Sequence, residues 1–233
     1  MKKIISMVLA ASLFAASIFA NAIAVGARGS FNVGVSAADD EVTVDFKGSN
    51  GFGMGAYVNV GLLKFGSLGL GLQPEVIFNS GNGITTTSSY VNGVAKTTSS
   101  LHTDTLDVPL LLTLDIPLTG SFILGAGVGP MVSFPLKADY TTSGSLSLGD
   151  FNWGGKTSVS DVSDIKGNIN FGVALDVNAK FAVAKIFRIV ADVRYYLDIT
   201  ETQLTVTSKG VSTTMDAFTR RTVNIGAGIE IAL

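Results

Sequence analysis

The residues of this chain that could perform chemistry are few. His102 is the only histidine, and Ser99, Ser100 and Asp104 lie near it in the sequence. A nucleophilic hydroxyl needs a base within hydrogen-bond reach and a third group that orients the base. A short stretch that is rich in Ser and Thr gives little reason to expect that geometry. We therefore expect His102 to be a solvated loop residue and the protein not to be an enzyme.

Two other motifs have the composition of binding sites, but the sequence around them does not predict the structure that such sites need. The glycine-rich run 125–129 has the composition of a phosphate loop, but 130–134 continues as a strand where a nucleotide site needs a helix. The acidic run 39–41 could hold a divalent cation, although a solvated acidic loop explains it equally simply. No spacing of histidines, cysteines and carboxylates indicates a metal enzyme. We predict no catalytic residue, no cofactor and no metal.

A larger set of charged residues occurs at alternate positions within apolar stretches. The set comprises Arg28, Glu75, Asp107, Asp115, Asp176, Lys180, Arg188, Asp192, Arg194 and Glu230, with Asp198 further along the same face of its stretch. Because a period of two places these side chains opposite the apolar ones, we predict a network of paired charges on one face. Asp115 and Arg188 lie near turns, where solvent exposure would also explain them.

The elements that must position these charges are β-strands. From Val223 to Leu233 apolar residues alternate with small or polar ones, and seven earlier stretches show the same period. The eight predicted strands cover about 25–36, 51–62, 67–79, 104–116, 121–136, 166–182, 187–200 and 223–233. The pattern predicts an all-β fold.

The links between the predicted strands alternate between short and long. The short links are 63–66, 117–120 and about 183–186, and the long ones are 37–50, 80–103, 137–165 and 201–222. This rhythm predicts an eight-stranded antiparallel up-and-down transmembrane β-barrel with long loops outside the cell and short periplasmic turns. A soluble sandwich would also alternate, but with a more polar composition. Eight strands are just enough for side chains to fill the interior, so we expect a plugged lumen.

The composition and the first residues agree with this prediction. The chain is 47% hydrophobic and 15% charged, and its mean hydropathy is +0.45. Residues 1–24 have the basic start, apolar middle and small-residue exit of a signal peptide, with cleavage after Ala24 or, nearly as well, after Ala22. We assign 25–233 to one barrel domain.

A formal charge of −2 disfavours nucleic acid as a partner, and no cysteine supplies disulfides.

Three prolines, Pro74, Pro109 and Pro130, fall inside predicted strands. A closed barrel has no free edge, so each proline should remove a ladder hydrogen bond and introduce a bulge or kink. The segments 70–76, 106–112 and 127–130, which contain these prolines, resemble strands three to five of the small outer-membrane β-barrel domain family, grouped with OmpX-like, OmpA-barrel-like and PorT-like barrels. The resemblance implies that prolines within strands are usual in this family.

The resemblance also implies a location and partners. It implies the outer membrane of a diderm bacterium, with membrane lipids, lipopolysaccharide and the barrel-assembly machinery as partners. It transfers no catalytic residue. Our leading hypothesis is a non-enzymatic barrel with a structural, envelope or adhesive role through four long extracellular loops. A narrow pore for small solutes and, less favoured, an enzyme that modifies lipid A remain alternatives. The sequence does not identify an extracellular ligand.

Overall fold

The computed structural model of the chain is built from β-strands. It describes residues 22–34, 44–48, 50–90, 95–148, 151–159, 169–200, 202–208 and 211–233. Within these ranges the strands are β1 (Ala22–Gly34), β2 (Val44–Gly48), β3 (Asn50–Phe65), β4 (Leu68–Tyr90), β5 (Ala95–Pro117), β6 (Phe122–Leu148), β7 (Phe151–Val159), β8 (Asn170–Ala182), β9 (Phe187–Asp198), β10 (Thr202–Ser208), β11 (Val211–Phe218) and β12 (Arg221–Ala232). The described residues include no helix with the length and apolarity needed to cross a membrane.

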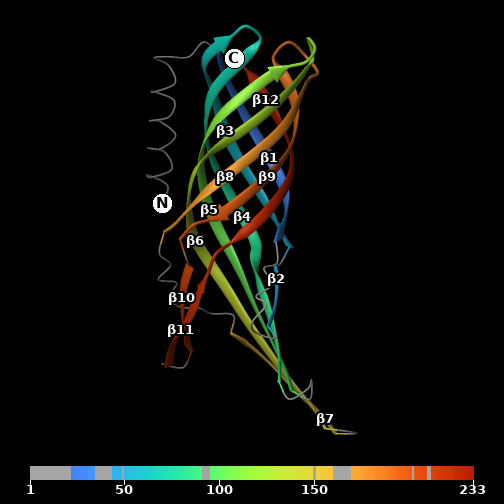
Figure 1. Cartoon of the computed structure of the whole chain (residues 1–233), viewed down its shortest axis with the longest axis vertical. Helices are drawn as coiled ribbons and strands as arrows, with labels where there is room; N and C mark the ends of the chain where they lie inside the picture. Colours follow the sequence, from blue (N-terminus) through green and yellow to red (C-terminus); the bar gives the residue numbers. More distant parts are fainter. Residues whose placement is uncertain are drawn as a thin grey trace.

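Eight of these strands close into a barrel. The hydrogen-bonded order is β1, β3, β4, β5, β6, β8, β9 and β12, and β12 pairs back onto β1. Every pairing is antiparallel, as short hairpin turns require. Figure 1 shows these strands wound around a common axis, with the short turns at the top of the view. The predicted eight-stranded up-and-down barrel is confirmed.

The alternation seen in the sequence corresponds to the two faces of the barrel wall. In β8, Asp176 is 2% exposed whereas its neighbour Val177 is 64% exposed. Aromatic side chains mark both ends of the outer face: Phe122 lies opposite Phe181 near the short turns, and Phe31 lies opposite Phe52 towards the other end. Apolar residues therefore face outward and polar residues inward, the arrangement that a lipid-embedded barrel needs.

Bulges lie at both rims of the barrel. Near the short turns, Leu62 is an extra residue of β3, between Gly61 and Leu63 in the pairing with β4. At the other rim, β4 has an extra residue between Asn79 and Asn82, where Gly81 has a φ of 78° that only glycine adopts easily. There Asp104 accepts hydrogen bonds from the Ser80 hydroxyl at 2.7 Å and from the Gly81 N–H at 3.3 Å.

Beyond this rim the wall continues as an open sheet. We predicted that β4 would end near residue 79, that β5 would begin near residue 104 and that β6 would end near residue 136. Instead, β4 and β5 are 23 residues long and β6 is 27. The extended parts pair with one another, and β2 and β7 add at the two sides, so the projecting sheet has the order β2, β4, β5, β6, β7. The sheet is the long taper at the bottom of Figure 1. The Ser- and Thr-rich segments thus form strands, since these residue types tolerate a solvated sheet as well as a loop.

We expected a bulge or a kink at each proline, and the unshifted register shows that no bulge lies at these positions. Pro109 lies opposite Glu75 in a two-residue gap of the β4–β5 pairing, and the offset is the same on both sides of the gap. Pro130 lies in an equivalent gap opposite Leu110, and Pro74 in one opposite Val58. Each proline therefore removes pairs locally, and the surrounding ladder holds the strands in place.

Candidate functional site: the barrel interior

In the part of the chain that the structure describes, the interior contains one charged cluster at its mouth and two more, centred on Arg194 and Arg220, on either side of an apolar layer. Arg194 of β9 is the centre of the inner cluster. Its guanidinium forms an ion pair with Glu75 of β4, donates to Asp176 of β8 at 2.8 Å and lies 3.5 Å from Asp192. The Arg194 side chain is 3% exposed. One buried cation thus joins strands from opposite parts of the wall.

A second buried arginine completes this level of the lumen. Arg28 of β1 forms an ion pair with Asp192 of β9, and both side chains are 3% exposed. The void beside Arg28, Asp192 and Arg194 measures only about 10 Å³, which is room for about one water molecule. Charged side chains therefore fill the cross-section at this height.

Amide side chains continue the hydrogen-bond network from the inner cluster towards the short turns. Gln73 donates to Glu75 at 2.6 Å and accepts from Asn59 at 2.8 Å, and Asn59 lies 3.4 Å from the Thr113 hydroxyl. Buried amides of this kind satisfy the polar atoms that ion pairs leave over. The chain of contacts ends at the barrel mouth next to the short turns.

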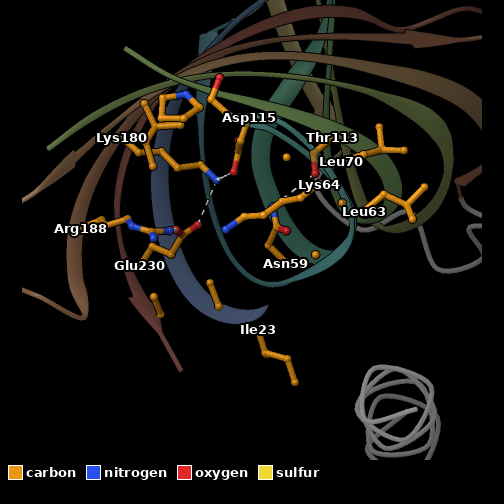
Figure 2. Close-up of a pocket in the computed structure, with 18 of the residues that line it drawn as sticks. Ile23, Asn59, Leu63, Lys64, Leu70, Thr113, Asp115, Lys180, Arg188 and Glu230 are labelled. Atoms are coloured by element: carbon orange, nitrogen blue, oxygen red, sulfur yellow. Dashed lines mark hydrogen bonds and ion pairs between the residues drawn. The ribbon is translucent and has the colours of Figure 1, made fainter. Parts of the chain in front are cut away.

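That mouth is a cavity of about 400 Å³, which we call the inner vestibule (Figure 2). Its floor is charged: Lys180 donates to Asp115 at 3.0 Å and lies 3.4 Å from Glu230, and Arg188 donates to Glu230 at 2.7 Å. Apolar side chains such as Ile23 line its side. The vestibule therefore opens at the end with the short turns and closes on this ion-pair cluster.

An apolar layer lies above the inner cluster. Ile77, Leu111, Met131, Ala174 and Tyr196 are each 0–1% exposed and contact one another inside the lumen. They come from β4, β5, β6, β8 and β9, so the layer spans five strands of the wall. This layer of apolar contacts lies between the charged cluster around Arg194 and the one around Arg220.

The outer cluster is organised by Arg220, which lies between β11 and β12. Its guanidinium donates to both carboxylate oxygens of Asp107 at 2.9 and 3.1 Å and to Thr105 at 3.0 Å. Asp198 accepts at 3.3 Å, and the Tyr196 ring lies 5.9 Å from the guanidinium carbon. Arg220 is 7% exposed. The outer end of the lumen is thus filled by a residue that leads in from the β10–β11 hairpin.

The residues for which we predicted an interior network all lie on the lumen face. They are Arg28, Glu75, Asp107, Asp176, Lys180, Arg188, Asp192, Arg194 and Glu230. Asp115 lies there too, with a side chain that is 26% exposed. Sequence reasoning missed Arg220, because we assigned 201–222 to a loop. The signal was available: Arg220 has the same parity as the inward residues Thr222 and Asn224.

The motifs with possible chemistry remain apart from this network. His102 is exposed in β5, whereas Asp104 is engaged by Ser80, and the Ser100 hydroxyl lies 3.1 Å from that of Thr85. The glycine-rich run lies within β6, and the acidic run 39–41 lies outside the described residues. In the part of the chain that the structure describes, no group of three His, Cys, Asp or Glu side chains is placed to hold a metal ion.

Comparison with known proteins agrees with this architecture. The family model described as "Outer membrane protein beta-barrel domain" matches residues 14–202. No curated protein sequence matches the chain.

Solved structures of outer-membrane proteins superpose along nearly the whole chain. Outer membrane protein OprG from Pseudomonas aeruginosa is 12% identical over 92% of this chain and 98% of its own, with a TM-score of 0.52. Neisserial surface protein A is 12% identical over 90% and 96%, with a TM-score of 0.40. Ail of Yersinia pestis is 13% identical over 90% and 97%, with a TM-score of 0.34. At such identities the likeness concerns the fold alone.

Proposed function

The chain belongs to the outer-membrane β-barrel domain family and is an integral protein of the outer membrane of a Gram-negative bacterium, and we propose that it is a non-enzymatic barrel that presents a β-sheet at the cell surface for contact with partners. The observation that carries the proposal is the projecting sheet formed by β2 and β7 with the extended parts of β4, β5 and β6. Lipopolysaccharide would surround its base, and the barrel-assembly machinery would insert the chain.

The projecting sheet has the features of a contact surface. Its two sides are β2, which pairs with β4, and β7, which pairs with β6; neither has a second neighbour within the described residues. An exposed strand edge can accept a strand from another molecule through backbone hydrogen bonds. The interior supports the same proposal because it disfavours the pore alternative: ion pairs and the apolar layer occupy the lumen that a pore would need.

Trimming the sheet tests this function without touching the barrel. Residues 86–99 are removed and Thr85 is joined to Ser100, whose backbones are paired in the ladder, through a short Asn-Gly turn. We expect the variant to reach the outer membrane and to remain heat-modifiable on unboiled gels, while binding of the cells to host cells or coated surfaces falls severalfold. Unchanged binding would contradict the proposal.

Conductance separates the proposal from the pore alternative. The purified barrel in a planar lipid bilayer should show no single-channel events beyond the background of the empty bilayer. Regular conductance steps from the intact protein would favour the pore.

A further inference from the structure

The outer cluster surrounds one guanidinium with acceptors that belong to the barrel wall. Asp107 and Thr105 come from β5, and Asp198 comes from β9, whereas Arg220 lies outside both strands. We propose that the outer lumen is a guanidinium-binding site, which the chain itself fills with Arg220. The ligand class is therefore the guanidinium group, either free or on an arginine side chain.

The geometry of the site selects a planar, forked cation. Two nitrogens of Arg220 reach the two oxygens of Asp107, at 2.9 and 3.1 Å, and a third nitrogen lies 3.3 Å from Asp198. A guanidinium offers five donors in one plane and stacks on aromatic rings, whereas an ammonium ion is a compact point charge. The site should consequently discriminate between these cations.

The acceptors are held in place by contacts that do not involve Arg220. Asn79 donates to Asp107 at 2.6 Å, Asn32 donates to Asn79 at 2.9 Å, and the Ser133 hydroxyl donates to the other oxygen of Asp107. Asp107 is completely buried. Removing the Arg220 side chain would thus leave a preorganised anionic pocket with space for the missing group.

The position of Arg220 links this site to the β10–β11 hairpin. Arg220 lies two residues after the end of the β10–β11 hairpin at Phe218, and its carbonyl accepts a hydrogen bond from the Asp198 N–H at 3.0 Å. Occupation of the site therefore fixes the foot of this hairpin on the barrel. An arginine from another molecule would compete for the same acceptors only when this foot is displaced.

Chemical rescue tests the proposal directly. Arg220→Ala should lower the temperature at which the barrel loses its folded mobility on unboiled gels. Guanidinium chloride, on the order of 10 mM and far below denaturing concentrations, should restore part of that loss, and ammonium chloride at equal ionic strength should not. At tenfold its Kd, a ligand raises the folded-to-unfolded ratio about elevenfold. The control is Arg221→Ala, whose side chain is exposed and whose stability guanidinium should not improve.

Two further outcomes keep the test decisive. If Arg220→Ala does not fold by itself, the yield of refolding into detergent with guanidinium replaces the melting temperature, and a yield no higher than with ammonium overturns the proposal. If it folds, rescue must disappear when Asp107→Asn is added. Rescue that persists without the Asp107 carboxylate, or rescue by ammonium to the same extent, would show a general salt effect. Neither readout depends on surface adhesion, so failure here leaves the proposed function standing.

Discussion

Replacing Arg194 with methionine should be the most destabilising single change in the lumen. Methionine has a similar length but no charge, so the substitution isolates the guanidinium. It leaves Glu75, Asp176 and Asp192 without their shared cation, and the first two of these side chains are completely buried. Breaking a buried ion pair by removing one partner costs about 3–5 kcal/mol. We expect a loss in that range, which is a hundredfold or more in the folding equilibrium.

The matched control is Arg188→Met at the inner vestibule. Arg188 is 26% exposed, and its partner Glu230 keeps a second cation, Lys180, at 3.4 Å. A partly solvated pair with such compensation contributes about 1 kcal/mol or less. Urea titrations in lipid vesicles, read as the fraction with folded mobility on unboiled gels, compare the two variants at equal protein-to-lipid ratio.

The result that would refute this reasoning is a pair of coincident titration curves. Equal midpoints would mean that the inner cluster contributes no more than a solvated ion pair. A further arm adds Glu75→Gln to Arg194→Met. Because the second change removes one of the uncompensated carboxylates, the double variant should be more stable than the sum of the two single losses indicates.

Leu111→Ala should cost about 2–5 kcal/mol in the same titration, because it leaves a cavity in the apolar layer. Gly129→Ala should impair refolding, since its Cβ would lie 1.8 Å from the Leu110 carbonyl oxygen, whereas Gly144→Ala in the same strand meets no atom within 4 Å and should behave as wild type. Mass spectrometry of the mature protein should find Ile23 as its first residue, because cleavage after Ala24 would remove backbone that pairs with Val60, Asn59 and Ala232; a first residue of Val25 would contradict this assignment.

Alternation, together with the rhythm of short and long links and the apolar composition, was enough to predict the wall of the barrel. A strand that faces lipid on one side and a filled lumen on the other must change polarity at every residue, so the period of two reports both the strand and its orientation. Asp107 and Asp176 could be placed inside because their neighbours are apolar and outward. The family resemblance drawn from the proline-containing segments was confirmed by the match over residues 14–202.

The sequence did not reveal the projecting sheet, because its strands lie in water and not in lipid. Beyond the rim, strands β4 to β6 continue through Ser- and Thr-rich segments that have no lipid-facing side, so the alternation disappears although the ladder persists. The apolar layer was hidden for a different reason. Leu111 has the same parity as the inward residues Asp107 and Asp115, but a run of three leucines gives no contrast in polarity that would mark an apolar layer inside the lumen.

The order of the layers along the lumen explains how so many buried charges are tolerated. Among the residues that the structure describes, five basic and seven acidic side chains lie in the interior, but each cluster has cations and carboxylates within hydrogen-bond distance of each other. A pore would need these charges to face water, where each pair is weak. The apolar layer lies between the Arg194 and Arg220 clusters on five of the eight strands, so these ion pairs lie in a medium of low dielectric, where they are stronger than in water. We therefore expect that opening this lumen would require changes in the Arg220 cluster, the Leu111 layer and the Arg194 cluster together, because all three lie inside it at successive heights.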